Sequence, residues 1–125
     1  MISEVSCESC KNKSYTFENT LDLSLDIPPP KTLLSLRSST ASLGKCLESF
    51  TSEVIVAEYL CSKCKKKGKS KRRVMIWKQP EILVVQLKRF IHDKYGKLEV
   101  LKSNVEFPIQ DLDLQPFTHK ESRGI

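Results

Sequence analysis

Four of the five cysteines stand in two Cys-x-x-Cys pairs, and this pattern constrains the fold more than any other feature. Cys7 and Cys10 form the first pair, Cys61 and Cys64 the second, with 50 residues between the pairs. Two residues between ligands let a tight turn direct both thiolates at one ion, and two such turns complete the tetrahedral sulfur set that zinc prefers. We therefore predict a structural zinc held by Cys7, Cys10, Cys61 and Cys64, with no open position for chemistry.

Two other uses of paired cysteines fit the sequence less well. A disulfide framework favours an even number of cysteines in an oxidising compartment, whereas this chain has five and shows no export signal. A redox pair needs a helix directly behind its first cysteine, but a lysine run containing Gly68 follows Cys64. No apolar run approaches the roughly 18 residues of a membrane span. We expect a reducing compartment, cytoplasmic, nuclear or both, and no membrane partner.

Apolar alternation predicts a mainly β chain of the α+β class. The 125 residues allow at most one domain, and a half-buried strand is expected within 15–27, where Leu21, Leu23, Leu25 and Ile27 share one face. The continuous apolar start of residues 82–90 is typical of a central strand covered on both faces. Further strands are expected at 54–60, 74–77 and 97–101, the last forming a hairpin after a turn at 92–96.

One short helix is expected at Leu43–Phe50. Leu43, Cys46, Leu47 and Phe50 fall on one stripe at helical spacing, and Ser42 is placed to cap the N-terminus. This pattern makes Cys46 a small buried apolar residue and not a nucleophile. The proline-rich stretch 28–40 reads as a surface connection, and the tail after Phe117 reads as frayed.

The remaining polar residues carry no recognisable catalytic pattern. His92 in a polar turn and His119 in the tail are expected to be solvated, because neither stands beside a partner carboxylate in a known context. Asp111 and Asp113 lie in a polar stretch without metal-type spacing and read as surface charge. We expect no catalytic residue in this chain.

The positive charge of the chain is concentrated in one segment. Between Lys63 and Arg73 eight residues are basic and none is acidic, so the overall charge of +6 becomes −2 without them. The segment reads first as a solvated loop between two ribbon strands, then as a nuclear import signal. Nucleic-acid binding ranks last, because single-strand binding calls for aromatic side chains among the basic ones and none occurs between Tyr59 and Trp77.

The order of these features resembles the ubiquitin-specific proteases, the papain-like cysteine deubiquitinases. The resemblance runs from residue 5 to about residue 117, and Gln86 stands where the family most often has His. The matching pieces are Cys7-Glu-Ser-Cys10, Leu21-Asp-Leu-Ser-Leu-Asp-Ile27, Ser42 to Phe50, Glu58-Tyr-Leu-Cys61-Ser-Lys-Cys64, Pro80 to Phe90 with its Leu-Lys-Arg-Phe strand, Lys97-Leu98, Val105-Glu-Phe-Pro108 and Leu112-Asp-Leu114.

The resemblance implies an incomplete catalytic domain over 1–125. It assigns zinc-ribbon fingers to about 1–27 and 52–78, the short helix to about 43–50, and part of an antiparallel palm sheet to about 82–117. In the family the two cysteine pairs hold structural zinc, and the fingers grip ubiquitin. The Gly-Asn-Thr-Cys-like and Gly-His-Tyr-like catalytic boxes of the family do not occur in this sequence.

The resemblance therefore predicts the ubiquitin-binding fingers and palm segment of a thiol protease that acts in protein deubiquitination, inactive by itself. A stand-alone, non-catalytic ubiquitin-binding zinc module is the first alternative, and a zinc-ribbon nucleic-acid-binding protein the second. The expected partner is ubiquitin or a ubiquitinated protein; the sequence leaves the ubiquitin-contacting residues and the oligomeric state open.

Overall fold

The computed structural model describes residues 1–28, 40–92 and 94–123. Two compact units interleave along the chain. The first comprises Met1–Thr20, Thr51–Glu81 and the tail from Leu114, and the second comprises Leu21–Phe50 and Ile82–Asp113. The described residues are mainly β with one α-helix, which confirms the expected fold class. Among the described helices, none combines the length and apolar character needed to cross a membrane.

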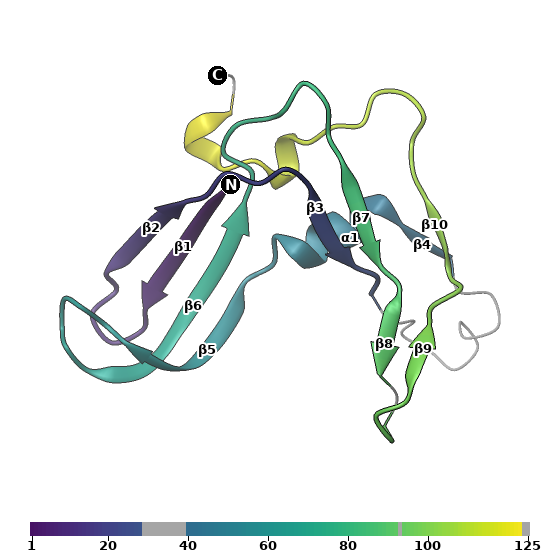
Figure 1. The fold of residues 1–125 in the computed structure, drawn as a ribbon. Coiled ribbons are helices and arrows are strands. Elements are labelled where there is room, and N and C mark those ends of the chain that lie inside the picture. Colours follow the sequence, from purple (N-terminus) through teal and green to yellow (C-terminus); the bar gives the residue numbers. More distant parts are fainter. Residues whose placement is uncertain (29–39, 93, 124–125) are drawn as a thin grey trace. The chain divides into compact units, whose positions relative to one another are not determined.

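The first unit is built on a four-stranded antiparallel sheet, called here the finger sheet. Its strand order is β2-β1-β6-β5, so the two middle strands are the first and the last of the four along the chain (Figure 1). The strands are β1 (Ile2–Cys7), β2 (Lys13–Phe17), β5 (Val54–Leu60) and β6 (Lys67–Met75). The cysteine pairs follow β1 and β5, as expected for turns that end ribbon strands.

The basic segment is a strand and not the expected solvated loop. β6 begins at Lys67 and contains five of the eight basic residues of this segment, whereas the sequence pattern predicts a strand only at 74–77. β6 lies between β1 and β5, so backbone hydrogen bonds on both edges override the low strand propensity of lysine and glycine. Ser70 is buried, and the basic side chains project from the sheet into solvent.

The C-terminal tail is packed and not frayed. It contains two short 3-10 helices, η2 (Gln115–Phe117) and η3 (Lys120–Ser122). Ile76 donates its N–H to the Phe117 carbonyl at 2.9 Å and accepts from the His119 N–H at 2.8 Å. Phe117, Thr118 and Ser122 are buried. Docking of this polar tail depends on pairing with the end of β6, which the local sequence does not reveal.

The described residues of the second unit form three two-stranded sheets and one helix. β3 (Leu23–Asp26) pairs with β7 (Val85–Lys88) and β4 (Thr40–Ser42) with β10 (Asn104–Glu106), and both pairs are parallel. β8 (Phe90–His92) and β9 (Leu98–Val100) form the expected hairpin, closed by a turn in which Gly96 takes φ +76°. The antiparallel pairing expected for the palm is therefore found in this hairpin. The β3–β7 and β4–β10 pairs are parallel, so the expectation is wrong for them.

The strands at 15–27 and 82–90 are each broken in two. β2 ends at Phe17 and β3 begins at Leu23, leaving Leu21 98% exposed instead of on the buried face. In residues 82–90, β7 ends at Lys88 and β8 begins at Phe90; the intervening Arg89 donates Nη1 hydrogen bonds to the Leu101 and Ser103 carbonyls. Among the described strands β7 pairs only with β3, and Ile82 is 81% exposed, so the double coverage is wrong for this part of the chain. Apolar side chains make it possible for a strand to be buried, but they are buried only where other elements pack against the strand.

The helix α1 (Leu43–Phe50) has the predicted bounds. Ser42 accepts a hydrogen bond from the Lys45 N–H at 3.2 Å, which satisfies a free donor of the first turn and confirms the predicted cap. Leu43, Cys46 and Leu47 are buried. The expected surface connection at 28–40 falls largely outside the described residues.

Candidate metal centre

Each cysteine pair is carried by a turn of the same backbone design. In the first, Cys7 donates its N–H to the Asn12 carbonyl and accepts from the Lys11 N–H, both at 2.9 Å. In the second, Cys61 donates to the Lys66 carbonyl at 3.2 Å and accepts from the Lys65 N–H at 2.8 Å. The two turns are therefore built alike, although one leaves a central strand and the other an edge strand.

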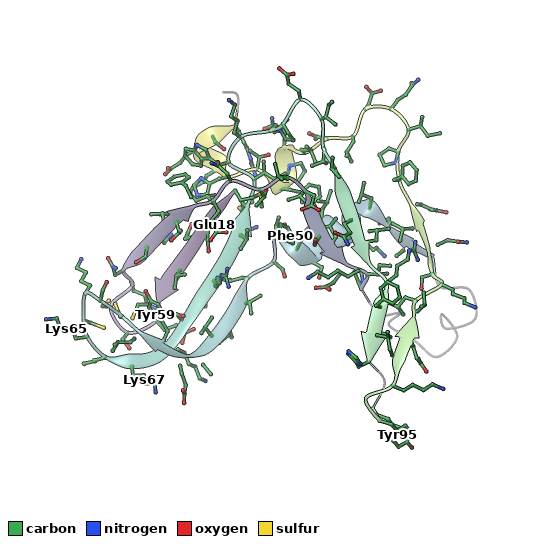
Figure 2. All side chains as sticks on the ribbon, in the orientation of Figure 1. Glu18, Phe50, Tyr59, Lys65, Lys67 and Tyr95 are labelled. Atoms are coloured by element: carbon green, nitrogen blue, oxygen red, sulfur yellow. The ribbon has the colours of Figure 1, made fainter. Side chains whose placement is uncertain are left out.

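Both turns close through a lysine in the left-handed backbone region. Lys11 has φ 61° and Lys65 φ 57°, each four residues beyond the first cysteine of its pair. A non-glycine residue there carries a steric cost of about 1–2 kcal/mol. The repeated cost indicates that the position of the two thiols, and not local propensity, determines the turn. Figure 2 shows Lys65 and Lys67 at the end of the finger sheet where these turns lie.

The four Sγ atoms converge at this end of the sheet. All lie within 4.8 Å of one another; the Cys7 and Cys64 sulfurs are 3.9 Å apart, and those of Cys10 and Cys61 are 3.6 Å apart. A tetrahedron with Zn–S bonds of about 2.3 Å has sulfur–sulfur edges of about 3.8 Å. The structure thus brings together all four cysteines that the sequence singled out, in a cluster that could hold a metal ion and has the dimensions of a zinc site.

The thiols of the cluster are electrostatically unequal. The Cys64 N–H, followed by that of Lys63, donates to the Cys61 sulfur, and these bonds outweigh burial and lower the Cys61 pKa to about 6. The Asn12 N–H likewise lowers the pKa of Cys10. At Cys10, however, burial and contacts with the other three thiols outweigh this hydrogen bond and raise the pKa to about 11. Such unequal thiols are expected where several anions must form side by side, and a bound cation favours deprotonation of them all.

The fifth cysteine and His92 lie in the second unit, and both behave as expected. Cys46 is fully buried on α1, and burial raises the pKa of its thiol. The Nδ1 atom of His92 lies 3.2 Å from the Gly96 carbonyl in an exposed turn. Asp111 and Asp113 are exposed, as expected for surface charge.

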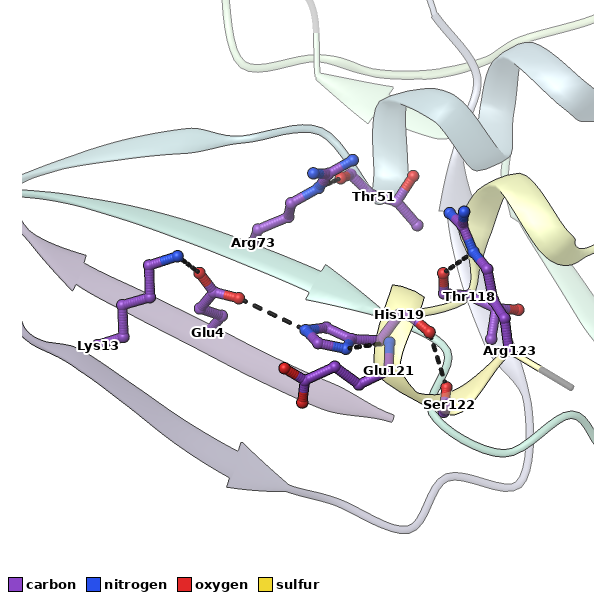
Figure 3. A network of polar contacts seen from close by, with 9 residues as sticks. All are labelled: Glu4, Lys13, Thr51, Arg73, Thr118, His119, Glu121, Ser122 and Arg123. Carbon is purple, nitrogen blue, oxygen red and sulfur yellow. Dashed lines mark hydrogen bonds and ion pairs between the residues drawn. The ribbon is translucent and has the colours of Figure 1, made fainter. Parts of the chain in front are cut away.

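His119 contradicts the expectation of a solvated side chain. It is 7% exposed, its Nδ1 accepts from the Glu121 N–H at 3.3 Å, and its Nε2 lies 3.7 Å from a Glu4 carboxylate oxygen (Figure 3). Lys13 pairs with the other oxygen of Glu4 at 3.3 Å. No local sequence pattern indicates this network, because β1, β2 and the tail meet only in the folded chain. Neither His92 nor His119 has a cysteine sulfur among its described polar partners.

A β-ribbon of this kind, with four thiols at its tip that could hold a metal ion and 50 residues between its two cysteine pairs, is typical of the ribbon finger of an α+β protein. The family model described as "Ubiquitin carboxyl-terminal hydrolase" matches residues 1–124. The chain belongs to this family, that of the ubiquitin-specific proteases.

Relatives in two kingdoms match nearly the whole chain. Ubiquitin carboxyl-terminal hydrolase 3 of Homo sapiens is 41% identical over 122 residues, which cover 90% of this chain and 23% of that protein. Ubiquitin carboxyl-terminal hydrolase 17 of Arabidopsis thaliana is 34% identical over 125 residues, 98% of this chain and 15% of that protein. The chain thus spans less than a quarter of the length of these curated relatives.

Solved structures of the SAGA DUB module share the fold. A chain of that module bound to monoubiquitin superimposes with a TM-score of 0.79 at 31% identity, covering 96% of this chain and 25% of that one. The module bound to ubiquitin aldehyde gives a TM-score of 0.76 at 30% identity, covering 94% of this chain and 24% of that one. The described units therefore correspond to a part of a deubiquitinase chain.

Proposed function

We propose that this chain is the fingers and partial palm of a ubiquitin-specific cysteine protease, and that it holds ubiquitin without cleaving it. The fingers comprise about 1–27 and 52–78, and the palm strands about 82–117. The observation that carries the proposal is the four-thiol cluster at the tip of a finger sheet, in a fold shared with a chain of the SAGA DUB module that was solved bound to monoubiquitin as a module. A sheet of this kind offers a rigid surface for a globular partner.

Zinc is the metal that the four thiols would hold. Cys7, Cys10, Cys61 and Cys64 would fill all its coordination positions, so the ion would supply rigidity and no reactive site. Two turns with the same backbone bonding, each ending a strand, support this assignment. The ion would join the β1 and β5 ends of the sheet, so that an edge strand and a central strand move as one body.

We expect no hydrolysis by this segment, because of the surroundings of its thiols and imidazoles. A cysteine protease needs a thiolate beside an oriented imidazole. Cys46 is buried with a raised pKa, the other four thiols belong to the cluster, and the polar partners described for both histidines contain no sulfur. An electrophilic ubiquitin probe should therefore form no covalent adduct with the 125-residue chain.

Binding is tested by titrating isotopically labelled ubiquitin with the zinc-loaded chain and following its amide resonances. We expect saturable shifts on one face of ubiquitin, and we expect chelation to abolish them because the finger tip opens. The Cys46→Ser chain serves as a matched control, since it loses a buried thiol outside the cluster. No shift at high concentration of the folded, zinc-loaded chain would contradict the proposal.

A further inference from the structure

The first unit carries an open cavity that the proposed function does not require. The cavity has a volume of about 430 Å³ and lies over the finger sheet. Five cationic side chains and two carboxylates line it, together with His119: Lys13, Lys71, Arg73, Lys120, Arg123, Glu4 and Glu53. One carboxylate, Glu4, is already neutralised by Lys13 at 3.3 Å. The excess of positive charge therefore comes from β6 and the tail.

Strand register places these cations and two aromatic rings on one face of the sheet. Directly paired residues share a face. Lys13, Ser6 and Lys71 form one row across three strands, and Tyr15, Glu4 and Arg73 form the next. Phe17 leads a third row with Ile2 and Met75. The aromatic residues of β2 thus lie two strand spacings, about 10 Å, from the basic residues of β6.

The aromatic rings remain accessible although they are fixed in place. Tyr15 is 49% exposed and packs edge-to-face on His119 at a centroid distance of 6.4 Å. Phe17 is 61% exposed and packs edge-to-face on Trp77 at 5.2 Å. An edge-to-face contact occupies one side of a ring and leaves surface on which another flat group can stack.

The two arginines of the cavity are held in a way that leaves their forked ends available. Arg73 donates Nε to the Thr51 carbonyl at 2.9 Å, and Arg123 donates Nε to the Thr118 carbonyl at 3.0 Å (Figure 3). These bonds orient the guanidinium groups while using one of five N–H donors each. The Nη donors can therefore contact a phosphate without paying the full entropy of ordering a long side chain.

We propose that this face of the finger sheet binds single-stranded nucleic acid, with phosphates in the cationic cavity and bases stacked on Tyr15 and Phe17. The absence of aromatic residues along the basic segment argues against such binding in the sequence, but the fold supplies them from β2. Alternating phosphate contacts and ring stacking are the features of a sequence-tolerant single-strand surface. An acidic peptide would use the same cations but would leave the exposed rings unused, so nucleic acid fits the surface better. The inference is independent of ubiquitin binding.

Fluorescence anisotropy with the full chain tests the proposal. The probes are labelled (dT) and (U) oligonucleotides of about 12 nucleotides, a length comparable with the site size of about 4–16 nucleotides of a single OB fold. Comparison of the two distinguishes DNA from RNA as the source of the strand. Four cations remain after Lys13 is paired with Glu4, so we expect affinity to fall about 50-fold between 50 and 200 mM salt.

Two sets of variants separate charge from stacking. Lys71→Gln with Lys120→Gln removes two cations that form no ion pair within the described residues, and the salt effect should shrink to about 7-fold. Tyr15→Leu should weaken binding about 5-fold or more at constant salt, and Tyr15→Phe should restore it because the ring is kept. Lys45→Gln with Lys102→Gln is the matched control, with the same charge change on exposed residues of the second unit.

The outcomes are distinct. Tighter binding of single strands than of duplex, with loss on Tyr15→Leu and in the cavity variant but not in the control, supports the proposal. Equal binding of single strands, duplex and heparin, unchanged by Tyr15→Leu, would show only the general attraction of polyanions to a basic chain and would overturn the proposal. Stronger binding of a polyglutamate peptide would overturn it in favour of an acidic protein partner. Circular dichroism of each variant establishes that it is folded.

Discussion

Replacing Cys61 by Ser is expected to open the end of the finger sheet, whereas the same change at Cys46 should leave it closed. The two residues are equally buried, at 1% and 0% exposure. Only the Cys61 sulfur belongs to the four-thiol cluster. The pair therefore separates the loss of a ligand from the insertion of a buried hydroxyl, which costs about 1–3 kcal/mol if unpaired.

The expected magnitude follows from the two cysteine turns, Cys7–Asn12 and Cys61–Lys66, of six residues each. Ordering their backbone costs about 12–24 kcal/mol at about 1–2 kcal/mol per residue. Their four backbone hydrogen bonds contribute about 2–6 kcal/mol. A structural zinc contributes about 10–16 kcal/mol, which closes the difference. Without it, the turns lack the energy to remain ordered.

Zinc content and amide hydrogen exchange measure the effect. The wild-type chain should carry one equivalent of zinc and protect the Lys11 and Lys65 amides, whose N–H groups close the turns. In Cys61→Ser, and after chelation of the wild-type chain, these amides should exchange rapidly while those of β3 and β7 in the second unit change less. Retained zinc and protection in Cys61→Ser, or their loss in Cys46→Ser, would refute the reasoning.

Three further predictions concern the second unit. Ser42→Ala should destabilise α1 by about 1 kcal/mol in urea unfolding, because the Lys45 N–H loses its partner; an unchanged midpoint would exclude the cap. Leu47→Ala should cost about 2–5 kcal/mol through the cavity it leaves, whereas Leu21→Ala, on a residue 98% exposed, should stay within about 0.5 kcal/mol. Equal effects would contradict the assigned burial. Burial raises the pKa of the Cys46 thiol in the folded chain above its ordinary value of 9.0. The contribution of this thiol to the free energy of unfolding is therefore complete below pH 9.0 and is lost as the pH rises through the pKa of the folded chain. Unfolding curves should therefore show a steeper alkaline loss of stability for the wild type than for Cys46→Ala, and parallel curves would refute this.

Features encoded by short-range spacing could be predicted in full. The bounds of α1 and its Ser42 cap follow from helical periodicity and a single side chain. The convergence of Cys7, Cys10, Cys61 and Cys64 follows from the geometry that a metal imposes on paired thiols. The helix and its cap depend on residues within a few positions of one another. The thiol cluster depends on the metal-binding chemistry of paired cysteines, which can be recognised from the residues themselves.

Features that depend on strand neighbours could not be predicted. The lysine run of β6 is a strand because β1 and β5 pair with its two edges, and the tail is ordered because Ile76 pairs with its backbone. Conversely, the apolar residues at 82–84 lack the expected coverage in the described chain. Backbone pairing over such separations contributes energy that no local propensity reflects.

The thiol cluster, the helix, the mainly β class and the resemblance to the ubiquitin-specific proteases could all be inferred from the residues alone. Which side chains of different strands share a face depends on the folded chain. Tyr15 and Arg73 are 58 residues apart in the chain, yet they occupy one row of the finger sheet across β1. The physical reason is that a spacing of two along each strand fixes which residues share that strand's face, whereas register between strands is set by long-range hydrogen bonds and burial.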